Sequence, residues 1–137
     1  RARTRGLELS AQTSFGGALE ARLAYTYLEA DNLTNGTRLL RRPRHAFNAD
    51  AWHDFGQGWS AGAGVLVVAG AQDVNALTFA TVDAEDYSVV RVYGAWQVSD
   101  RLTVKARVEN LLDEDYFEVC NFRTPGRAAY GGVRLRF

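Results

Sequence analysis

Apolar and polar residues alternate with a period of two along most of this chain. Since successive side chains of a β-strand point to opposite faces, the alternation predicts strands with one apolar and one polar face. Helical periodicity is weak, so the pattern predicts an all-β chain. The predicted strands span seven segments: 5–15, 18–29, 44–53, 59–70, 87–98, 101–109 and 127–137.

The connections between these strands are alternately short and long. Tight turns are expected at Gly16-Gly17, at 54–58 and at Ser99-Asp100, and longer polar connections cover 31–42, 71–86 and 110–126. Antiparallel strands joined in this way put all short turns at one end, with the C-terminus, and all long connections at the other. Outer-membrane barrels have this arrangement. The segment 44–53 is the least regular, and a bulge could shift its register, so its facing stays open.

The last strand ends on an aromatic residue. Val133, Leu135 and Phe137 fall on its apolar face, between Arg134 and Arg136. A terminal aromatic residue on such a strand is typical of outer-membrane barrels. Four aromatic residues lie on apolar faces beside a short turn or the terminus, and are expected at one height, as in an interfacial girdle: Phe15, Trp59, Trp96 and Phe137.

A soluble β-sandwich would show the same alternation, so the pattern alone leaves both architectures open. The aligned aromatic residues favour the barrel. So do small residues such as Ala61, Ala63, Gly94 and Ala106 on the apolar face, because a sandwich core needs larger side chains. Seven strands cannot close a typical outer-membrane barrel, whose strand number is even and at least about eight. The chain is therefore expected to be part of a larger barrel, or to complete a barrel with copies of itself.

Composition narrows the function classes. Sixteen basic residues balance 16 acidic ones, so no charge excess favours a nucleic-acid partner. The longest apolar run, Val65–Ala69, is strand-sized. Cys120 is the only cysteine, which leaves no disulfide framework. The chain opens in mid-pattern without a signal peptide, so an exported protein is expected to carry one further upstream.

No catalytic or metal-binding constellation stands out. His45 and His53 are eight residues apart, about 26 Å along a strand, and cannot share a metal ion. Asp83, Glu85 and Asp86 form an acidic group that suits either a calcium site or a solvated loop. No nucleophile–base pair is recognisable. The sequence therefore predicts no enzyme, no cofactor and no metal site.

The segment from Arg101 to Phe137 resembles the C-terminal end of TonB-dependent outer-membrane receptors. That family shows an Asn-Leu-hydrophobic-Asp-x-x-Tyr stretch, a Pro-Gly-Arg step and a final strand ending in Phe. The matching residues here are Asn110, Leu111, Asp113, Tyr116, Pro125, Gly126, Arg127 and Phe137. The stretches RTRGLEL at 3–9 and RRPRHAFN at 41–48 also resemble strand openings of the family.

The resemblance implies that residues 1–137 are the C-terminal portion of an antiparallel, up-and-down transmembrane β-barrel. That barrel would have 22 strands, lie in the bacterial outer membrane and contain an N-terminal plug domain. Such receptors import a scarce nutrient, namely a ferric siderophore, haem or cobalamin, with energy supplied through TonB. The plug and the TonB-contact segment would be absent from this chain. The modest long connections favour a cobalamin or small-siderophore receptor.

The resemblance also implies partners and residue roles. Membrane lipid would contact the apolar face, and the polar face would line a hydrated lumen or pack against the plug. The barrel-assembly machinery would bind the terminal strand at Val133, Leu135 and Phe137. The motif residues are expected to be structural, with Arg127 pairing with Asp113 or Glu109. Two alternatives stay open: a soluble or self-assembling β-domain that binds a partner through its long loops and, ranked last, an outer-membrane enzyme.

Overall fold

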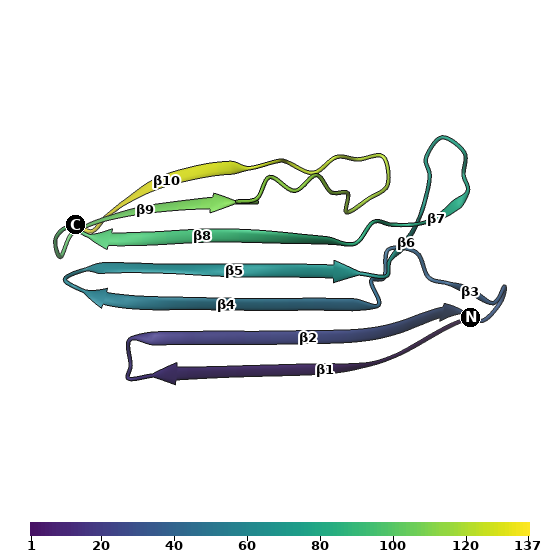
Figure 1. Cartoon of the computed structure of the whole chain (residues 1–137), viewed down its shortest axis with the longest axis horizontal. Coiled ribbons are helices and arrows are strands. Elements are labelled where there is room, and N and C mark those ends of the chain that lie inside the picture. Colours follow the sequence, from purple (N-terminus) through teal and green to yellow (C-terminus); the bar gives the residue numbers. More distant parts are fainter.

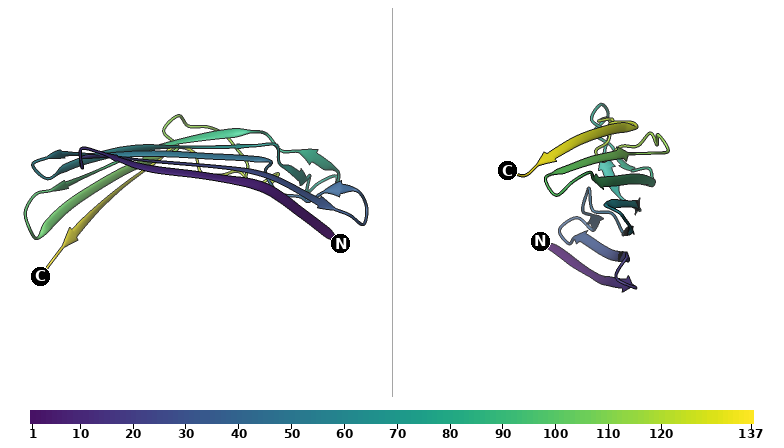
Figure 2. Two further views of the ribbon diagram at one scale, coloured as in Figure 1. Left: turned by 90° about the horizontal axis from the view of Figure 1, so that it is seen from below. Right: turned by 90° about the vertical axis from the view of Figure 1, so that its left-hand side faces the viewer.

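The computed structural model describes all 137 residues as a single curved layer of antiparallel strands (Figures 1 and 2). The main sheet has the strand order β1-β2-β4-β5-β8-β9-β10, so each long strand pairs with the next long strand along the chain. The seven long strands are β1 (Ala2–Phe15), β2 (Leu19–Asn32), β4 (His45–Gly56), β5 (Trp59–Ala69), β8 (Tyr87–Gln97), β9 (Leu102–Glu109) and β10 (Ala128–Leu135). The seven predicted strands and their antiparallel order are confirmed.

Three short strands lie within the long connections and were not predicted. Strand β3 (Thr37–Arg38) pairs with the end of β2, and β6 (Gln72–Val74) pairs with β7 (Thr81–Asp83) as a separate hairpin. Each has only two or three residues, which is too short for a period of two to be recognised in the sequence.

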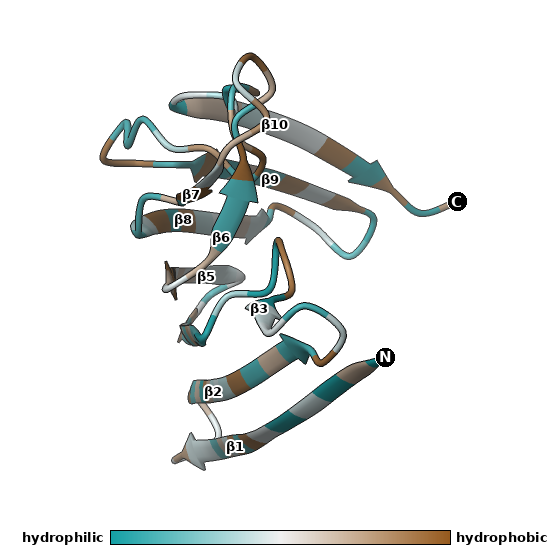
Figure 3. Ribbon diagram, turned by 90° about the vertical axis from the view of Figure 1, so that its right-hand side faces the viewer, coloured by the Kyte–Doolittle hydropathy of each residue, from teal (hydrophilic) through white to brown (hydrophobic).

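The register places the apolar residues of all seven long strands on one continuous face. One row across the sheet runs Thr13, Ala21, Ala51, Ala63, Val92, Val108 and Ala129. The row beside it on the opposite face runs Ser14, Glu20, Trp52, Gly62, Tyr93, Arg107 and Tyr130. Figure 3 shows the resulting bands of hydrophilic and hydrophobic residues along the strands.

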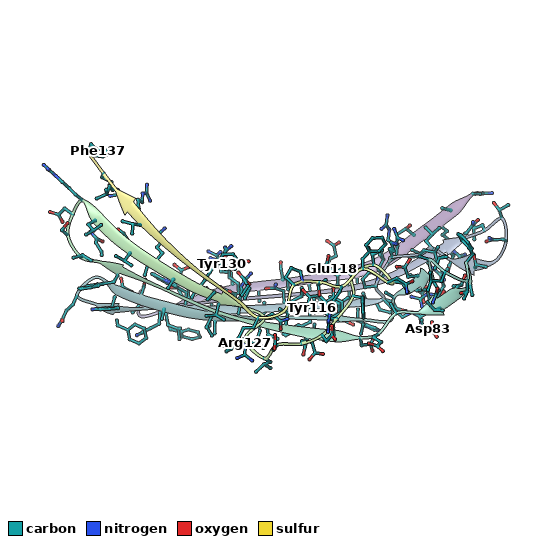
Figure 4. All side chains as sticks on the ribbon, turned by 90° about the horizontal axis from the view of Figure 1, so that it is seen from above. Asp83, Tyr116, Glu118, Arg127, Tyr130 and Phe137 are labelled. Atoms are coloured by element: carbon teal, nitrogen blue, oxygen red, sulfur yellow. The ribbon has the colours of Figure 1, made fainter.

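The polar face is the hollow side of the curved sheet. Tyr130, which belongs to the polar row, lies on that side in Figure 4. A shallow depression on the same face is lined by polar-row residues of β4, β8, β9 and β10. The apolar face is therefore the convex, outer surface.

The short turns lie at one end of the sheet with the C-terminus, and the long connections lie at the other end with the N-terminus (Figure 1). Gly16 and Gly17 have φ angles of 58° and 71°, and the Ala18 N–H donates to the Phe15 carbonyl at 3.3 Å. Three residues, Gly16, Gly17 and Ala18, connect the last pair Phe15↔Leu19. The two central residues of the turn have positive φ angles, which is the type I′ geometry that favours glycine.

The sequence did not decide which side chains of β4 lie on the apolar face. The strand is regular over most of its length. Its pairs with β5 run without interruption from His45↔Ala69 to Asp54↔Ser60, and the register shifts only between Asp54 and Gly56. The irregularity is thus confined to the short turn. Phe47, Ala49 and Ala51 lie on the apolar face.

Strands β1 and β2 extend further toward the long connections than the sequence pattern indicates. They stay paired back to Ala2↔Asn32, where charged side chains replace apolar ones on the outer face. Arg3 pairs with Asp31 and Arg5 pairs with Glu29, each at 3.1 Å. The alternation of apolar and polar residues ends there, but cross-strand ion pairs continue the sheet. Strand β10, in contrast, ends at Leu135, two residues before the predicted end.

The chain has no hydrophobic core of its own. Only four of 137 residues are buried, and the accessible surface is 9672 Å². A compact soluble monomer of 15.1 kDa exposes about 7,100 Å². The soluble sandwich requires a second layer of sheet, which this chain does not have. No helix in the structure is long and apolar enough to cross a lipid bilayer.

Gly62 packs closely against its neighbours on the polar face. A Cβ added there would lie 2.5 Å from Cζ of Tyr93 and 2.7 Å from the backbone oxygen of Ala51. Glycine therefore lets the Tyr93 ring lie across β5. Gly132, on the same face of β10, has nothing within 4 Å of an added Cβ.

We predict that Gly62→Ala destabilises the folded sheet by about 1–3 kcal/mol, because the methyl group forces the Tyr93 ring or the β4 backbone to move. Gly132→Ala, the matched control, should leave stability unchanged. The measurement is the midpoint of thermal unfolding, followed by circular dichroism of the purified protein in detergent. Equal midpoints for the two variants would contradict the assigned packing.

Candidate functional site: the long connections and the inner wall

The three long connections meet around one buried carboxylate, that of Asp73. This residue of β6 is 2% exposed. Its Oδ1 accepts hydrogen bonds from Arg41 Nε at 2.9 Å and from the Val74 N–H at 2.8 Å. Its Oδ2 accepts the Cys120 N–H at 2.6 Å. One side chain thus joins residues from 31–42, 71–86 and 110–126.

Other contacts reinforce this junction. Arg38 donates to the Gly70 carbonyl at 2.6 Å, and the Arg41 N–H donates to the Gln72 carbonyl at 2.7 Å. At the tip of the β6–β7 hairpin, the Ala76 N–H donates to Oδ1 of Asn121 at 2.9 Å. The three connections therefore form one hydrogen-bonded unit at the end of the sheet.

Asp73 is ionised because its partners outweigh its burial. Burial opposes the charged form, but the two backbone N–H groups and the Arg41 guanidinium stabilise it, so the pKa of Asp73 is lowered. Sequence reasoning missed this residue. Its partners are 32 and 47 positions away, and two of the groups that bind it are backbone N–H groups, which carry no sequence signal.

The motif residue Asn110 closes a tight loop after β9. It is 3% exposed and has a φ of 49°. Its Oδ1 accepts the Glu114 N–H and its Nδ2 donates to the Glu114 carbonyl, both at 2.8 Å. The Leu111 N–H extends the pairing to β8 by donating to the Val90 carbonyl at 2.8 Å. The contacts of Asn110 are thus made within its own loop.

Asp113 and Arg127 pair through the backbone of Arg127 rather than through its guanidinium. Oδ1 of Asp113 accepts the backbone N–H of Arg127 at 2.7 Å, whereas the Arg127 guanidinium has no carboxylate partner. A Cβ on Gly126 would lie 2.9 Å from that same Oδ1, so the Pro125-Gly126 step brings the backbone close to Asp113. Of the two expected partners of Arg127, the structure brings Asp113 to it, through the backbone N–H, and Glu109 pairs instead with Arg107.

Tyr116 stacks on Tyr87 at the start of β8, with ring centroids 4.4 Å apart. Its carbonyl accepts the Thr124 hydroxyl at 2.7 Å, which ties the two halves of 110–126 together. Nearby, Arg123 pairs with Asp115 and lowers the pKa of that exposed carboxyl. Figure 4 shows Tyr116 and Glu118 within this connection.

The acidic group in 71–86 does not converge. Asp83 accepts from Gln72 at 2.9 Å, and Asp86 accepts the Gly70 N–H at 2.8 Å. These acids do not form a group that could hold a metal ion. Of the two alternatives for Asp83, Glu85 and Asp86, the structure favours the solvated loop.

The inner wall carries a row of paired charges. Arg91 lies 2.9 Å from Asp50, which also accepts the Tyr93 hydroxyl at 2.6 Å. Arg22 pairs with Glu20 at 3.6 Å on β2, and Arg107 pairs with Glu109 at 3.5 Å on β9. The Arg107 guanidinium also lies over the Tyr130 ring, 4.6 Å from its centroid.

Of the predicted girdle residues, Phe15, Trp59 and Trp96 lie on the outer face near the short turns, and only the two tryptophans touch. Trp59 and Trp96 are cross-strand partners whose rings stack at 4.7 Å with an interplanar angle of 6°. Phe15 lies on β1, and Phe137 extends beyond β10 with its whole side chain exposed. Phe55, packed edge-on against His53 at 4.5 Å, is an aromatic residue of this end that the sequence reasoning missed.

Val133 and Leu135 pair with Val104 and Leu102 on β9 and belong to the same outer face. They are 67% and 59% exposed, so nothing in the chain covers them. Further toward the long connections, Tyr25 pairs with Phe47 and Tyr27 pairs with His45. The Tyr25 hydroxyl shares a hydrogen bond of 2.8 Å with Nδ1 of His45. These aromatic residues form a second group at the opposite end of the apolar face.

We predict that Asp73→Ala loosens all three long connections together, because Arg41 and the Cys120 N–H lose their acceptor. Loss of such bonds costs about 1–3 kcal/mol, so amide exchange at Cys120 should be roughly ten- to a hundred-fold faster. Hydrogen exchange with mass spectrometry would measure this. Asp83→Asn, an exposed acid of the same hairpin, is the control and should leave the exchange unchanged. An effect confined to residues 71–86 would contradict the role of Asp73 as a junction.

We predict that acid releases the junction. The pKa of Asp73 is lower in the folded chain than the ordinary value of about 3.9, so its stabilisation is fully present above about pH 4. That stabilisation is lost as the pH falls through the lowered folded pKa. Pepsin should therefore cut within 71–86 and 110–126 increasingly fast below about pH 4. Pepsin should cut the Asp73→Asn variant rapidly over the whole pH range, and its cleavage rate should depend much less on pH.

The sequence matches the family model "TonB dependent receptor-like, beta-barrel" over residues 1–111. The vitamin B12 transporter BtuB of Vibrio cholerae is 28% identical over 134 residues, which cover 97% of this chain and 22% of that protein. The chain thus spans about a fifth of the length of this curated relative.

Solved structures agree on the fold. The copper transporter OprC superposes with a TM-score of 0.81 at 23% identity, covering 99% of this chain and 24% of OprC. The ferric-catecholate import receptor Fiu of Escherichia coli K12 superposes in its closed form with a TM-score of 0.85 at 21% identity, covering 99% of this chain and 21% of Fiu. These relatives are receptors and transporters of the bacterial outer membrane rather than enzymes, so the all-β barrel fold, the location and the non-enzymatic class are confirmed. The chain belongs to the TonB-dependent receptor family, as part of its outer-membrane β-barrel.

Proposed function

We propose that residues 1–137 form the C-terminal part of the barrel of a receptor that imports a scarce nutrient across the outer membrane. The plug and the segment that contacts TonB belong, in this proposal, to the remainder of the protein. The observation that carries the proposal is the apolar outer face, which continues over all seven hydrogen-bonded strands without a core beneath it. Such a sheet is stable when lipid covers that face and further strands pair with both edges.

The unpaired edges of β1 and β10 support the larger barrel. In lipid each unsatisfied backbone group costs several kcal/mol, so a seven-stranded open sheet is not a stable membrane structure. In the proposed receptor, strands from the rest of the protein pair with both edges and close a barrel of 22 strands. A soluble or self-assembling β-domain would instead have to cover the outer face with protein.

Cobalamin is the first nutrient to test. One curated relative is named a vitamin B12 transporter, whereas the solved relatives include a receptor for ferric catecholates and a copper transporter. Ferric siderophores are the second class. The joined long connections support a role in ligand binding, because they place three loops as one unit at the mouth of the proposed barrel.

The proposal assigns the motif residues a structural role. Asn110, Asp113 and Tyr116 bond or stack within the chain, and Gly126 allows the close approach to Asp113. Phe15, Trp59, Trp96 and Phe137 would lie in the inner interfacial girdle. Energy would reach the receptor through TonB by way of the upstream part of the protein.

We predict that the full-length protein, purified in detergent, binds cyanocobalamin more tightly than a ferric siderophore, and that cells which depend on it take up cobalamin. Isothermal titration calorimetry would measure binding, and radiolabelled cobalamin would measure uptake by the cells. Binding of a ferric siderophore alone would redirect the proposal to iron. The absence of this protein from isolated outer membranes would refute it.

We predict that Phe137→Asp reduces the amount of folded, heat-modifiable receptor in outer membranes several-fold. Phe137 contacts nothing else in the chain, so its replacement removes no packing within the sheet. It places a charge where the proposal has lipid and the barrel-assembly machinery. Arg136→Asp, one residue earlier and expected on the inner face from the alternation, is the matched control and should assemble normally. Equal loss in both variants would mean that any added negative charge at the terminus is harmful.

A further inference from the structure

Asn35 and Gly36 lie at the tip of the hairpin that joins β2 to β3 (Figure 1). The last cross-strand pair is Asn32↔Thr37, so residues 33–36 form the turn, and all four are exposed. Gly36 has a φ angle of 70°, and its N–H donates to the Asn32 carbonyl at 2.9 Å. Asparagine followed by glycine is also a reactive pair, because glycine has no side chain to keep its backbone nitrogen away from the neighbouring amide.

The side-chain amide of Asn35 is polarised by Thr37. Its Oδ1 accepts hydrogen bonds from the Thr37 hydroxyl at 2.8 Å and from the Thr37 N–H at 3.3 Å. Two donors on one carbonyl oxygen stabilise negative charge that develops there, as the donors of an oxyanion hole do. The turn therefore favours attack by a nucleophile on Cγ of Asn35.

The other asparagines of the chain lack this combination. Each is followed by a residue with a side chain: Asn32, Asn48, Asn75, Asn110 and Asn121. Oδ1 of Asn75 also accepts two backbone N–H groups, at 2.9 Å and 3.2 Å, but the methyl group of Ala76 stands beside the nitrogen that would attack. Asn110 is only 3% exposed, so water reaches it poorly. Asn35 alone joins an exposed position, a polarised amide and a following glycine.

We propose that Asn35 is a self-modification site, at which the turn converts the asparagine into aspartate and isoaspartate. Water or hydroxide first removes the Gly36 N–H proton, which breaks the hydrogen bond to Asn32. The Gly36 nitrogen then forms a bond with Cγ of Asn35, while the side-chain nitrogen takes up a proton from water and leaves as ammonia. Water opens the resulting cyclic imide at either carbonyl group. The sum consumes water and releases ammonia, without any oxidation or reduction.

The isoaspartate product would loosen the joined long connections. An isoaspartate lengthens the main chain by a carbon atom, so Thr37 no longer falls opposite Asn32 and β3 loses its register. Arg38 of β3 donates to the Gly70 carbonyl at 2.6 Å, a contact that joins the first long connection to the second. Modification at Asn35 therefore weakens this contact, and the effect grows with the age of the protein.

Mass spectrometry of the full-length protein, incubated in detergent at neutral pH for several days, tests the site. Trypsin releases residues 23–38 as one peptide, so Asn32 is an internal control for Asn35. Asn35 should deamidate many times faster than Asn32 and Asn75, and electron-transfer fragmentation should find isoaspartate as well as aspartate in its place. Equal rates at Asn35 and Asn75 would overturn the proposal.

Variants separate the contribution of the folded turn from that of the Asn-Gly pair itself. Thr37→Val removes the hydroxyl and should slow deamidation several-fold in the folded protein. In a synthetic peptide of residues 23–38 the same change should have little effect, because an unfolded chain does not hold the hydroxyl on Oδ1. Thr34→Val is the matched control in the same turn and should leave the rate unchanged, since its hydroxyl does not contact Asn35. If Thr37→Val does not slow the folded protein, the turn gives no assistance and the proposal fails.

Hydrogen exchange measures the consequence for the connections. The Leu39 N–H, which donates to the Ala30 carbonyl at 2.8 Å beside β3, should exchange several-fold faster in aged protein than in fresh protein. Asn35→Gln, whose longer side chain closes a ring much more slowly, should keep the exchange of fresh protein after the same incubation. Unchanged exchange in protein that carries isoaspartate would refute the effect on the long connections.

Discussion

The structure depends on one constraint: a single sheet whose two faces meet different surroundings. Every strand alternates its side chains, so the pairing register decides whether the apolar residues of neighbouring strands share a face. Here the register keeps them together over seven strands, and a shift of one residue in any strand would turn its apolar side inward. The type I′ turn at Gly16-Gly17 and the bulge confined to Asp54–Gly56 maintain that register at the short turns.

The strands could be predicted from the sequence because their signal is local. The alternation within 59–70, the alternation within 87–98 and the glycine pair at 16–17 are each formed by residues close together in the sequence. All three predict features that the structure contains. The extension of β1 and β2 escaped notice because ion pairs such as Arg5–Glu29 replace apolar contacts there. The alternation of apolar and polar residues shows which side chains share a face of a strand. It does not show which side chains form ion pairs across strands, such as those 24 residues apart.

The candidate site was harder to predict for the same reason. The motif residues were found through resemblance, yet their partners were not: Asp113 accepts a backbone N–H rather than a guanidinium. Asp73 was overlooked altogether, since a single aspartate in a polar loop looks like any other. Its importance comes from burial and from groups that the fold brings to it. Such junctions become visible only when distant connections are placed side by side.

The two outward ion pairs at the start of β1 also act as a ruler for the bilayer. Hydrocarbon cannot accommodate Arg5 and Glu29, so its outer boundary lies between them and Leu7. Phe15, expected at the inner interface, lies eight positions further along the strand, or about 27 Å at the usual rise per residue. With the tilt of about 40° common in such barrels, the span normal to the membrane is about 21 Å. An apolar face of this height suits a membrane thinner than an average bilayer.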